Sequence, residues 1–447
     1  MPKNKLVKNI FFVLVGMLLL GGCQSHKKKY DATETALEWA KLTTYITQYT
    51  PSNSPTFASR AFAYISLTMY ECVVHSDTSY NSMALKLNGL NQLPQPDNQI
   101  KYNWTAVLNA GQAKIIKLIY QQTSDENIIK IDSLKNVIHD QLVQDSTIEI
   151  IKKSEAYGEQ IAQSIFNWSK TDGGHRGYLK NFDKDFYREE FLGSWKPPLF
   201  AQSFSHKPLH PYWGQNRTFA KSNRAISIPE YVKFDTVPGS PYYEQFLAVY
   251  KKEKTLTQKE KEAAIWWGDD PDVSFTPPGH SYYLATVVLG GVRPDVVKTA
   301  QTLAQTALAV ADAFIKCWEW KYHYFSERPN TYVPKYIDEE WESFWPDPPF
   351  PAFPSGHAIQ AAAAATVLEA NLGTVSFIDK AHEGRPKDEV RDTEFVSRRF
   401  DSFWDFALET ADSRFYGGIH TPIDNTVGLE NGKRIANNIL DLNWKNE

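Results

Sequence analysis

The chain has 447 residues and a formal net charge of −4. That length is sufficient to form one large hydrophobic core or two smaller ones. The nearly balanced charge gives no general basis for binding nucleic acid or an anionic surface, so no nucleic-acid partner is expected. The sequence contains no repeats, no nucleotide-binding glycine motif and no cysteine spacing typical of zinc sites.

The N-terminus has the pattern of an export signal. Three lysines precede an apolar run that ends in Leu20-Gly21-Gly22-Cys23, and this ending resembles a bacterial lipobox. We therefore predict a lipoprotein signal peptide at residues 1–22, lipidation of Cys23 and a polar tether at 23–31. The mature protein would be an exported bacterial lipoprotein, held to a membrane in the periplasm or at the cell surface. A plain signal peptide or a short membrane anchor is the alternative.

The following segments have helical periodicity. Apolar residues recur at spacings of three and four, which predicts helices at residues 32–49, 57–75, 102–121, 127–142 and 148–169. After Gly173-Gly174 and up to about residue 238, the chain is rich in proline, glycine and aromatic residues and has little periodicity. A segment of this length is too long for a passive loop, so we expect it to fold over the helices and cover the site.

The second half of the chain is also helical in pattern. Its periodicity predicts helices at residues 242–252, 257–267, 281–289, 297–325, 358–371, 396–411 and 422–440. Two loops are expected between them, a proline-rich aromatic one at 341–353 and a polar, exposed one at 373–390. The fold class predicted is therefore all-α. Cys72 and Cys317 fall in apolar helical patterns, which favours two buried free thiols over a disulfide.

Three short segments supply cations and histidines at fixed local spacings. They are Lys321-x6-Arg328-Pro329, Pro354-Ser355-Gly356-His357 and Ser413-Arg414-x5-His420-x3-Asp424. Cationic side chains and the backbone N–H groups of a helix N-terminus both bind anions. Together the segments predict a site for a tetrahedral oxyanion, phosphate or vanadate, with one histidine free to bond the central atom.

Local spacing suggests how each segment contributes. Lys321 and Arg328 are seven residues apart, about two helical turns, so we expect one helix that ends at Pro329 to carry both on one face. Gly356 directly precedes a predicted helix and lets an anion approach the N–H groups there. Arg414 adds a planar fork that can pair with two oxygens at once.

The third segment places a carboxylate near a histidine. His420 precedes Thr421-Pro422, which is typical of a helix start. Asp424 follows four residues later and is expected to accept from one ring nitrogen of His420, presenting the other to the metal or phosphorus. Alternatively, Asp424 is only the acidic end of a capping box; the two roles are compatible.

Taken singly, several of these residues have ordinary explanations. Lys321 alone would be a solvated helix lysine, Ser413 a turn residue with a local hydrogen bond, and His357 a satisfied histidine at a helix start. Their joint occurrence favours the anion site over these explanations.

The three segments resemble, at every position, the signature of the type 2 phosphatidic acid phosphatase and vanadium haloperoxidase superfamily. The resemblance spans about residues 297–440. It implies two helical bundles that share one core, with an N-terminal bundle and covering loop at 32–230 and a C-terminal bundle with the site at 231–447.

The resemblance also implies roles for the site residues. His420 would be the axial vanadium ligand or, in a phosphatase, the phosphorylated nucleophile, and His357 would be the general acid–base. The remaining anion-binding residues would hold the equatorial oxygens: Lys321, Arg328, Ser355, Gly356 and Arg414.

Features outside the signature favour a vanadium-dependent haloperoxidase. The chain is long and has no second apolar run of about eighteen residues. Trp318 and Phe350 stand at offsets that look like the halide-side wall of haloperoxidases, although ordinary aromatic core is the alternative. The segment from Trp266 to His280 is similar to a region of secreted bacterial haloperoxidase-like proteins; otherwise His280 is a satisfied histidine in a loop between helices.

The first functional hypothesis is oxidation of a halide, iodide or bromide favoured, by hydrogen peroxide to hypohalous acid, with vanadate as cofactor and Lys321 polarising the peroxide. The second is an acid phosphatase that acts on a phosphate ester through a phosphohistidine and needs no cofactor. The third is a non-catalytic surface lipoprotein that only binds an oxyanion. The signature does not separate the first two, and the sequence does not indicate the halide, the organic acceptor or the oligomeric state.

Overall fold

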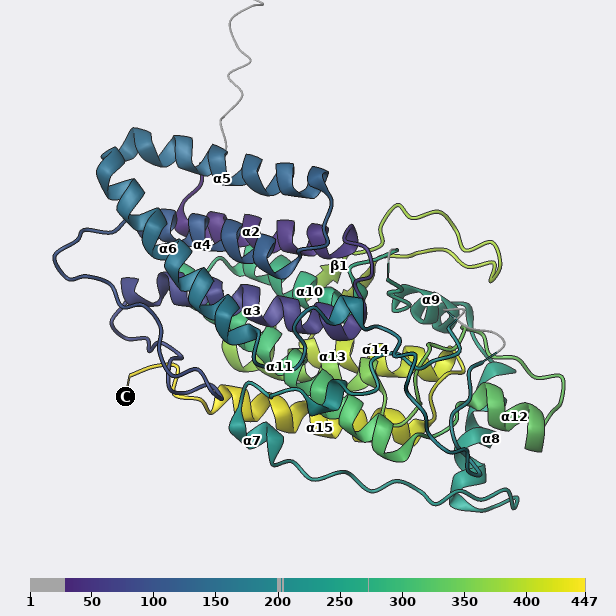
Figure 1. Cartoon of the computed structure of the whole chain (residues 1–447). Helices are drawn as coiled ribbons and strands as arrows, with labels where there is room; N and C mark the ends of the chain where they lie inside the picture. Colours follow the sequence, from purple (N-terminus) through teal and green to yellow (C-terminus); the bar gives the residue numbers. More distant parts are fainter. Residues whose placement is uncertain (1–28, 199–201, 203–204, 272, 447) are drawn as a thin grey trace, which may run out of the picture.

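The computed structural model describes residues 29–198, 202, 205–271 and 273–446 (Figure 1). The predicted signal peptide and Cys23 lie outside the described residues, so the export and lipidation of the chain stay predictions. Among the residues that are described, no helix is both long enough and apolar enough to cross a membrane.

The N-terminal half forms the five predicted helices, with ends shifted by a few residues. Four of them begin at a capping side chain, Asp31, Ser54, Asn103 or Ser124, that accepts a hydrogen bond from a backbone N–H of the first turn. The helices are α2 (Ala32–Gln48), α3 (Pro55–Val73), α4 (Trp104–Ile119), α5 (Asp125–Asp145) and α6 (Ile148–Ser169).

The C-terminal half is also helical, apart from one short antiparallel pair of strands, β1 (Phe377–Asp379) and β2 (Arg398–Phe400). A short helix, α7 (Lys221–Arg224), lies in the covering segment. The larger helices are α8 (Pro241–Glu253), α9 (Gln258–Trp266), α10 (Thr276–Val292), α11 (Val296–Tyr324), α12 (Pro329–Tyr336), α13 (Gly356–Leu372), α14 (Phe403–Tyr416) and α15 (Pro422–Leu440).

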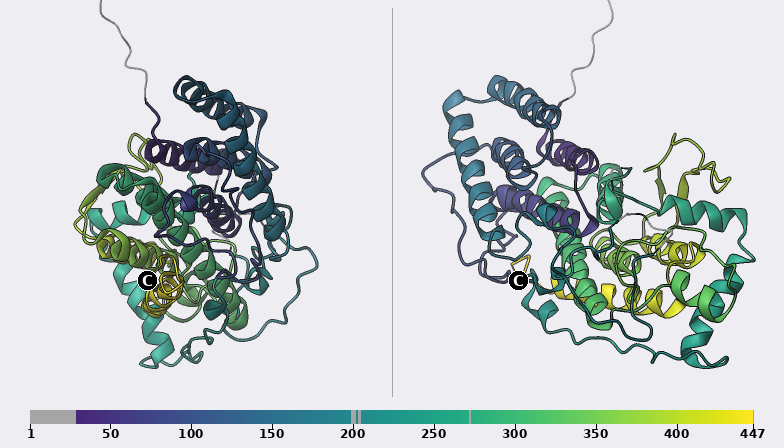
Figure 2. Two further views of the ribbon diagram at one scale, coloured as in Figure 1. Left: turned by 90° about the vertical axis from the view of Figure 1, so that its left-hand side faces the viewer. Right: turned by 45° about the vertical axis from the view of Figure 1, so that its right-hand side comes forward.

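Helix α11 joins the two halves. It packs against α3 of the N-terminal half and against α13 and α15 of the C-terminal half, and one continuous apolar core includes residues of both (Figures 1 and 2). The predicted all-α fold of two helical bundles around a shared core is therefore confirmed. The boundary proposed between residues 230 and 231 stays a prediction.

Small residues bring α13 and α15 together. Residues 361–365 are all alanine and fully buried. A Cβ added to Gly432 would lie 2.2 Å from the backbone oxygen of Ile359, and one added to Gly428 would lie 2.8 Å from the Cβ of Ala358. This close approach fixes the start of α15 beside the start of α13, where two of the three predicted site segments lie.

The prediction of one helix that carries both Lys321 and Arg328 and ends at Pro329 was wrong, although the range 297–325 predicted from periodicity agrees with α11 to one residue. The helix stops at Tyr324 because Phe325 takes a left-handed conformation with φ of 51°. Arg328 lies outside the helix as the N-cap of α12, and Pro329 occupies a first-turn position of that helix. Lys321 and Arg328 therefore do not share a helical face; the turn between them brings them together.

Three further boundaries differ from the predictions. Residues 396–411 are not one helix, since β2 comes first and a capping box between Ser402 and Asp405 begins α14 only at Phe403. The expected exposed loop at 373–390 contains β1, and Asp379 and His382 within it are buried. Helix α10 begins five residues early, because its two prolines fall in the first turn, where no intrahelical N–H is needed.

Candidate active site

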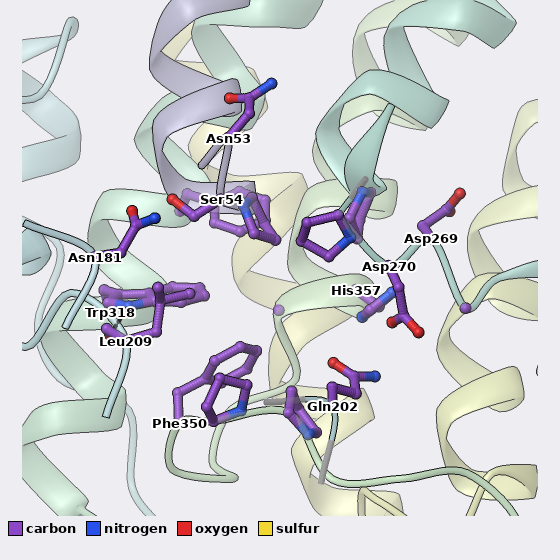
Figure 3. A pocket seen from close by; sticks show the side chains of 18 of the residues that line it. Asn53, Ser54, Asn181, Gln202, Leu209, Asp269, Asp270, Trp318, Phe350 and His357 are labelled. Atoms are coloured by element: carbon purple, nitrogen blue, oxygen red, sulfur yellow. Dashed lines mark hydrogen bonds between the residues drawn. The ribbon is translucent and has the colours of Figure 1, made fainter. Parts of the chain in front are cut away.

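Two of the three predicted segments line one cavity of about 270 Å³ (Figure 3), and Arg328 of the first segment contacts it through His420. Gly356 and His357 at the start of α13 and His420 just before α15 form one end of it. The other walls come from the turn before α3, the covering segment, the loop before α10, helix α11 and the 348–350 loop. The predicted cover is thus present, since Asn181, Phe182, Gln202 and Leu209 line the cavity.

The cations Lys321 and Arg328 are held by backbone carbonyls. Lys321 Nζ donates to the Pro351 oxygen at 2.9 Å and also to Ala352. Arg328 donates from Nε to the Phe350 oxygen at 3.0 Å and from Nη1 to the Ile419 oxygen at 2.7 Å. Both side chains are buried. Their hydrogen bonds to the carbonyls of the 350–352 loop hold them in position.

Arg414 extends from α14 and is also fully buried. Its Nη2 donates to the Ala264 carbonyl, and its Nε lies 3.1 Å from Ser413 Oγ. Its Nη1 is buried and has no hydrogen-bond partner among the described residues. One donor of the fork is therefore free for a bound group.

Buried carboxylates act on these three cations only from a distance, Asp424 on Lys321 and Arg328 and Asp270 on Arg414. Within the described part of the chain, none of Lys321, Arg328 and Arg414 has a carboxylate oxygen at ion-pair distance. Burial lowers the pKa of all three side chains from their ordinary values. Buried charges are costly without a partner, so an anion bound among them would stabilise their charged forms.

Helix α13 directs its N-terminus at the same place. Ser355 is the N-cap, and its Oγ accepts from the Ala358 N–H at 3.3 Å. Gly356 and His357 follow in the first turn. Burial, followed by the charge of Arg414, pulls the pKa of His357 well below its usual value. Its Nε2 is buried without a partner among the described residues, so it is available to exchange a proton with a bound group.

His420 is oriented by Asp424 as predicted. Its Nδ1 lies 2.9 Å from Asp424 Oδ2, and the Thr421 N–H donates to that same oxygen at 3.0 Å. Asp424 thus has both the capping role and the orienting role. When His420 Nδ1 carries the proton donated to Asp424, Nε2 holds the lone pair. That Nε2 lies 3.5 Å from Arg328 Nη1, so it faces the group of cations.

Trp318 and Phe350 lie together on the cavity wall. Their ring centroids are 5.0 Å apart, and Lys321 Nζ lies 5.3 Å from the centroid of Phe350. Trp318 Nε1 donates to the Leu209 carbonyl of the covering segment at 3.1 Å. Trp318 is also part of the hydrophobic core, so the cavity-wall and core explanations both hold for it.

A buried charged network that the sequence did not predict lies beside the cavity. His280 bonds Asp269 Oδ2 through Nδ1 at 2.8 Å and Asp379 Oδ2 through Nε2 at 2.7 Å. His382 Nε2 reaches Asp269 Oδ1 at 3.1 Å, and Trp266 Nε1 donates to Asp379 at 2.6 Å. Asp269, His280 and His382 lie close enough for a metal site, but hydrogen bonds alone already satisfy the network.

This network gives the segment from residue 266 to 280 a structural role. His280 is on α10 rather than in a loop, which corrects the alternative explanation, although its nitrogens are satisfied as that explanation expected. Burial alone would lower the pKa of His280, but Asp269 and Asp379 raise it to about 10. Nothing in the sequence indicated that Asp379 and His382 belong to this network, because they lie about a hundred residues further along the chain than His280 and Asp269.

Fold and site together define an all-α protein of two packed bundles with a buried, cation-lined anion site. Residues 301–445 match the family model described as the VCPO second helical-bundle domain. A search of curated proteins by sequence gave no match.

Solved structures agree over most of the chain. The crystal structure described as that of the first bacterial vanadium-dependent iodoperoxidase is 26% identical and has a TM-score of 0.80, covering 94% of this chain and 99% of that one. The apo-type bacterial vanadium-dependent chloroperoxidase is 15% identical with a TM-score of 0.66, covering 89% of this chain and 97% of its own; this second likeness concerns the fold alone. The family model and the iodoperoxidase structure support a place for this chain in the vanadium haloperoxidase superfamily.

Proposed function

We propose that this protein is a vanadium-dependent haloperoxidase, which oxidises a halide with hydrogen peroxide. The observation that carries the proposal is a group of three buried cations beside Nε2 of His420, none of which has a carboxylate at ion-pair distance in the part of the chain that the structure describes. The likeness to a bacterial vanadium-dependent iodoperoxidase over 94% of this chain supports the same choice.

The residues present fit vanadate. Arg414 Nη1 and His357 Nε2 are buried polar atoms that have no partner among the described residues, and a tetrahedral oxyanion would supply acceptors for both. Vanadate bound here would act as a Lewis acid that makes peroxide reactive toward halide. The residues that would hold it are Lys321, Arg328, Ser355, Gly356, His357, Arg414 and His420, of which His420 would supply a ring nitrogen to the vanadium.

Each remaining role follows from a side chain's position. His357 takes and returns the peroxide proton at Nε2. Lys321 adds a positive charge that polarises the peroxide. Asp424 keeps His420 in the tautomer whose Nε2 is free. The cavity wall of Trp318 and Phe350 suits a large, weakly hydrated anion, so we propose iodide or bromide as the halide and hypohalous acid as the product.

A phosphohistidine phosphatase is the second candidate. His420 is oriented by Asp424 at 2.9 Å, which is also the arrangement of an activated nucleophile. Its substrate would be a phosphate ester, with His357 protonating the leaving oxygen.

Paired assays distinguish the two functions. Metal-free protein is tested for iodide oxidation with peroxide and for hydrolysis of p-nitrophenyl phosphate, each with and without orthovanadate. A haloperoxidase gains iodide oxidation only when orthovanadate is added. Phosphatase activity in the metal-free protein that orthovanadate inhibits, without any gain of iodide oxidation, would contradict our choice.

We also propose that the protein acts outside the cytoplasm, anchored through a lipid on Cys23. The support is the lipobox-like Leu20-Gly21-Gly22-Cys23 after an apolar run. Cys23→Ser is expected to leave halide oxidation intact and to remove the protein from the membrane fraction or leave its signal uncleaved. Normal cleavage and unchanged membrane partition in the variant would refute lipidation.

A further inference from the structure

Helix α5 carries more apolar surface than its packing uses. Ile131, Ile138 and Leu142 form the buried apolar stripe that faces the rest of the fold. A second apolar pair, Ile129 and Val137, lies on another side of the helix, and these side chains are 65% and 49% exposed. A helix packed on a globular core needs only one apolar face. The second face is left uncovered by the residues that the structure describes.

This side of α5 and the neighbouring side of α2 form one open groove of about 560 Å³ (Figure 1). Leu42 and Tyr45 of α2 and Leu134 of α5 complete its apolar lining beside Ile129 and Val137. A single exposed apolar side chain is ordinary on a protein surface. A contiguous group that spans two helices indicates a surface that contacts something else.

Tyrosine and lysine side chains surround the groove. Tyr45 and Tyr49 are both exposed, and their ring centroids lie 4.5 Å apart. Lys130 Nζ lies 5.1 Å from the centroid of Tyr45, and Lys41 lines the groove from α2. At a boundary between lipid and water, a tyrosine ring lies at the level of the headgroups and a lysine extends its ammonium toward the phosphates. The side chains around the groove therefore suit a bilayer surface.

The described part of the chain begins at this groove. The backbone N–H and carbonyl of Tyr30 each form a hydrogen bond of 2.9 Å with the side-chain amide of Gln141 on α5, and Tyr30 lines the groove. Cys23 precedes Tyr30 by seven residues, so the chain between them spans at most about 25 Å. Residues 27–29 are all lysine, and basic residues beside a lipid anchor are attracted to anionic headgroups. A lipid on Cys23 would therefore hold this groove close to the bilayer.

We propose that the grooved face of α2 and α5 lies on the surface of the bilayer to which the protein is anchored. The inference rests on the proposed lipid on Cys23, which keeps the face at a high effective concentration beside the membrane. Glu126 and Asp140 stand three residues before Ile129 and three residues after Val137, on the same side of α5. These carboxylates stay in water, so the contact is shallow and involves the apolar side chains between them.

The contact is tested on the lipidated protein in vesicles of phosphatidylethanolamine and phosphatidylglycerol. Because Cys72 and Cys317 are buried, a polarity-sensitive thiol dye can be directed to Ile129→Cys. Its emission should shift to the blue in the vesicles, and nitroxide-labelled lipids should quench it. Leu192→Cys is the matched control, since Leu192 is an apolar residue of the covering segment that is 73% exposed. A dye at that position should keep its aqueous emission.

A charge placed in the groove gives a second measurement. Val137→Asp, added to Ile129→Cys, should remove most of the quenching, because its carboxylate would have to leave water for the contact to form. Asn136→Asp adds the same charge one residue away on α5 and outside the groove, so quenching should change little. Helix α5 contributes no residue to the active-site cavity, and both variants should oxidise iodide as the unmodified protein does.

Aqueous emission from the dye at Ile129→Cys in vesicles, equal quenching at Leu192→Cys, or quenching that Val137→Asp leaves unchanged would overturn the inference. A blue shift without vesicles that grows with protein concentration would also overturn it, because a second copy of the chain would then cover the face.

The lipid anchor is checked separately by mass spectrometry of the purified protein. If Cys23 carries no lipid, the anchor is refuted, and the dye measurement is repeated on Ile129→Cys with Cys23→Ser and added vesicles. A blue shift that depends on the vesicles would then support the membrane-facing surface without the anchor. No shift would refute both.

Discussion

The two site histidines, His420 and His357, differ in the surroundings of their Nε2 atoms. His420 Nε2 faces Arg328, and Asp424 fixes the other ring nitrogen of His420. His357 Nε2 is buried and has no partner in the described part of the chain. His420→Ala should therefore abolish activity and greatly weaken vanadate retention in equilibrium dialysis. His357→Ala should retain much of the vanadate but lower turnover by about 10²–10⁴. Equal loss of vanadate from the two variants would refute this division of roles.

The aromatic pair Trp318 and Phe350 gives a second test at the scale of single residues. If the rings contact the halide, Phe350→Ala and Trp318→Ala should change the KM for iodide and bromide more than the KM for peroxide. If they are only core, Trp318→Ala should lose about 3–5 kcal/mol of stability, as for a fully buried ring, and Phe350→Ala should lose less because Phe350 is only partly buried, with unchanged halide kinetics in both. Steady-state kinetics and melting curves of both variants distinguish the cases. Unchanged halide KM in stably folded variants would remove these residues from the halide site.

Single residues of the anion site could be predicted from the sequence because their spacing is local. Asp424 lies one helical turn from His420, and Ser355 directly precedes the helix whose N-terminus it caps. Arg328 was expected at the site for a wrong reason, since the left-handed Phe325 ends α11 before it. The seven-residue spacing between Lys321 and Arg328 does not by itself reveal such a backbone turn.

At the scale of elements, packing between distant segments determines some of the secondary structure and burial that local sequence patterns do not predict. Periodicity predicted a helix at 396–411 where a strand comes first, and polarity predicted exposure for the segment that carries Asp379. Asp379 is buried because it pairs with His280 on α10, a contact that no local pattern encodes. The capped helices of the N-terminal half were predictable because their start signals lie beside them in the sequence.

The network around His280 predicts a pH-dependent contribution to stability. Its pKa is about 10 in the folded protein, compared with 6.5 as the ordinary value. The stabilisation is therefore fully present below pH 6.5 and is lost as the pH rises through about 10. His280→Gln should cost about 3 kcal/mol near pH 6, because it leaves Asp269 and Asp379 without their shared partner. The difference from the unmodified protein should shrink toward pH 10 in urea unfolding.

A histidine outside the network is the control. His323 is exposed in the last turn of α11, so His323→Gln should change stability little at either pH. A His280→Gln penalty that is the same at pH 6 and pH 10 would show that His280 acts by packing rather than by its charge.

At the scale of the whole molecule, the cavity forms where the two halves and the covering segment meet. Its walls combine residues from position 52 to position 420. The sequence predicted a cover over the site because the segment after Gly173 is too long and too aromatic for a passive loop. It could not predict which cover residues reach the cavity, since Asn181, Gln202 and Leu209 have no periodic relation to the motifs.

The most direct test of the account is a titration of metal-free protein with orthovanadate, with peroxide-dependent iodide oxidation measured at each step. Activity should be absent at the start, rise to a plateau at one vanadate per chain, and fall when excess phosphate competes for the same cations. Full iodide oxidation before any vanadate is added, or indifference of the loaded protein to phosphate, would contradict the account.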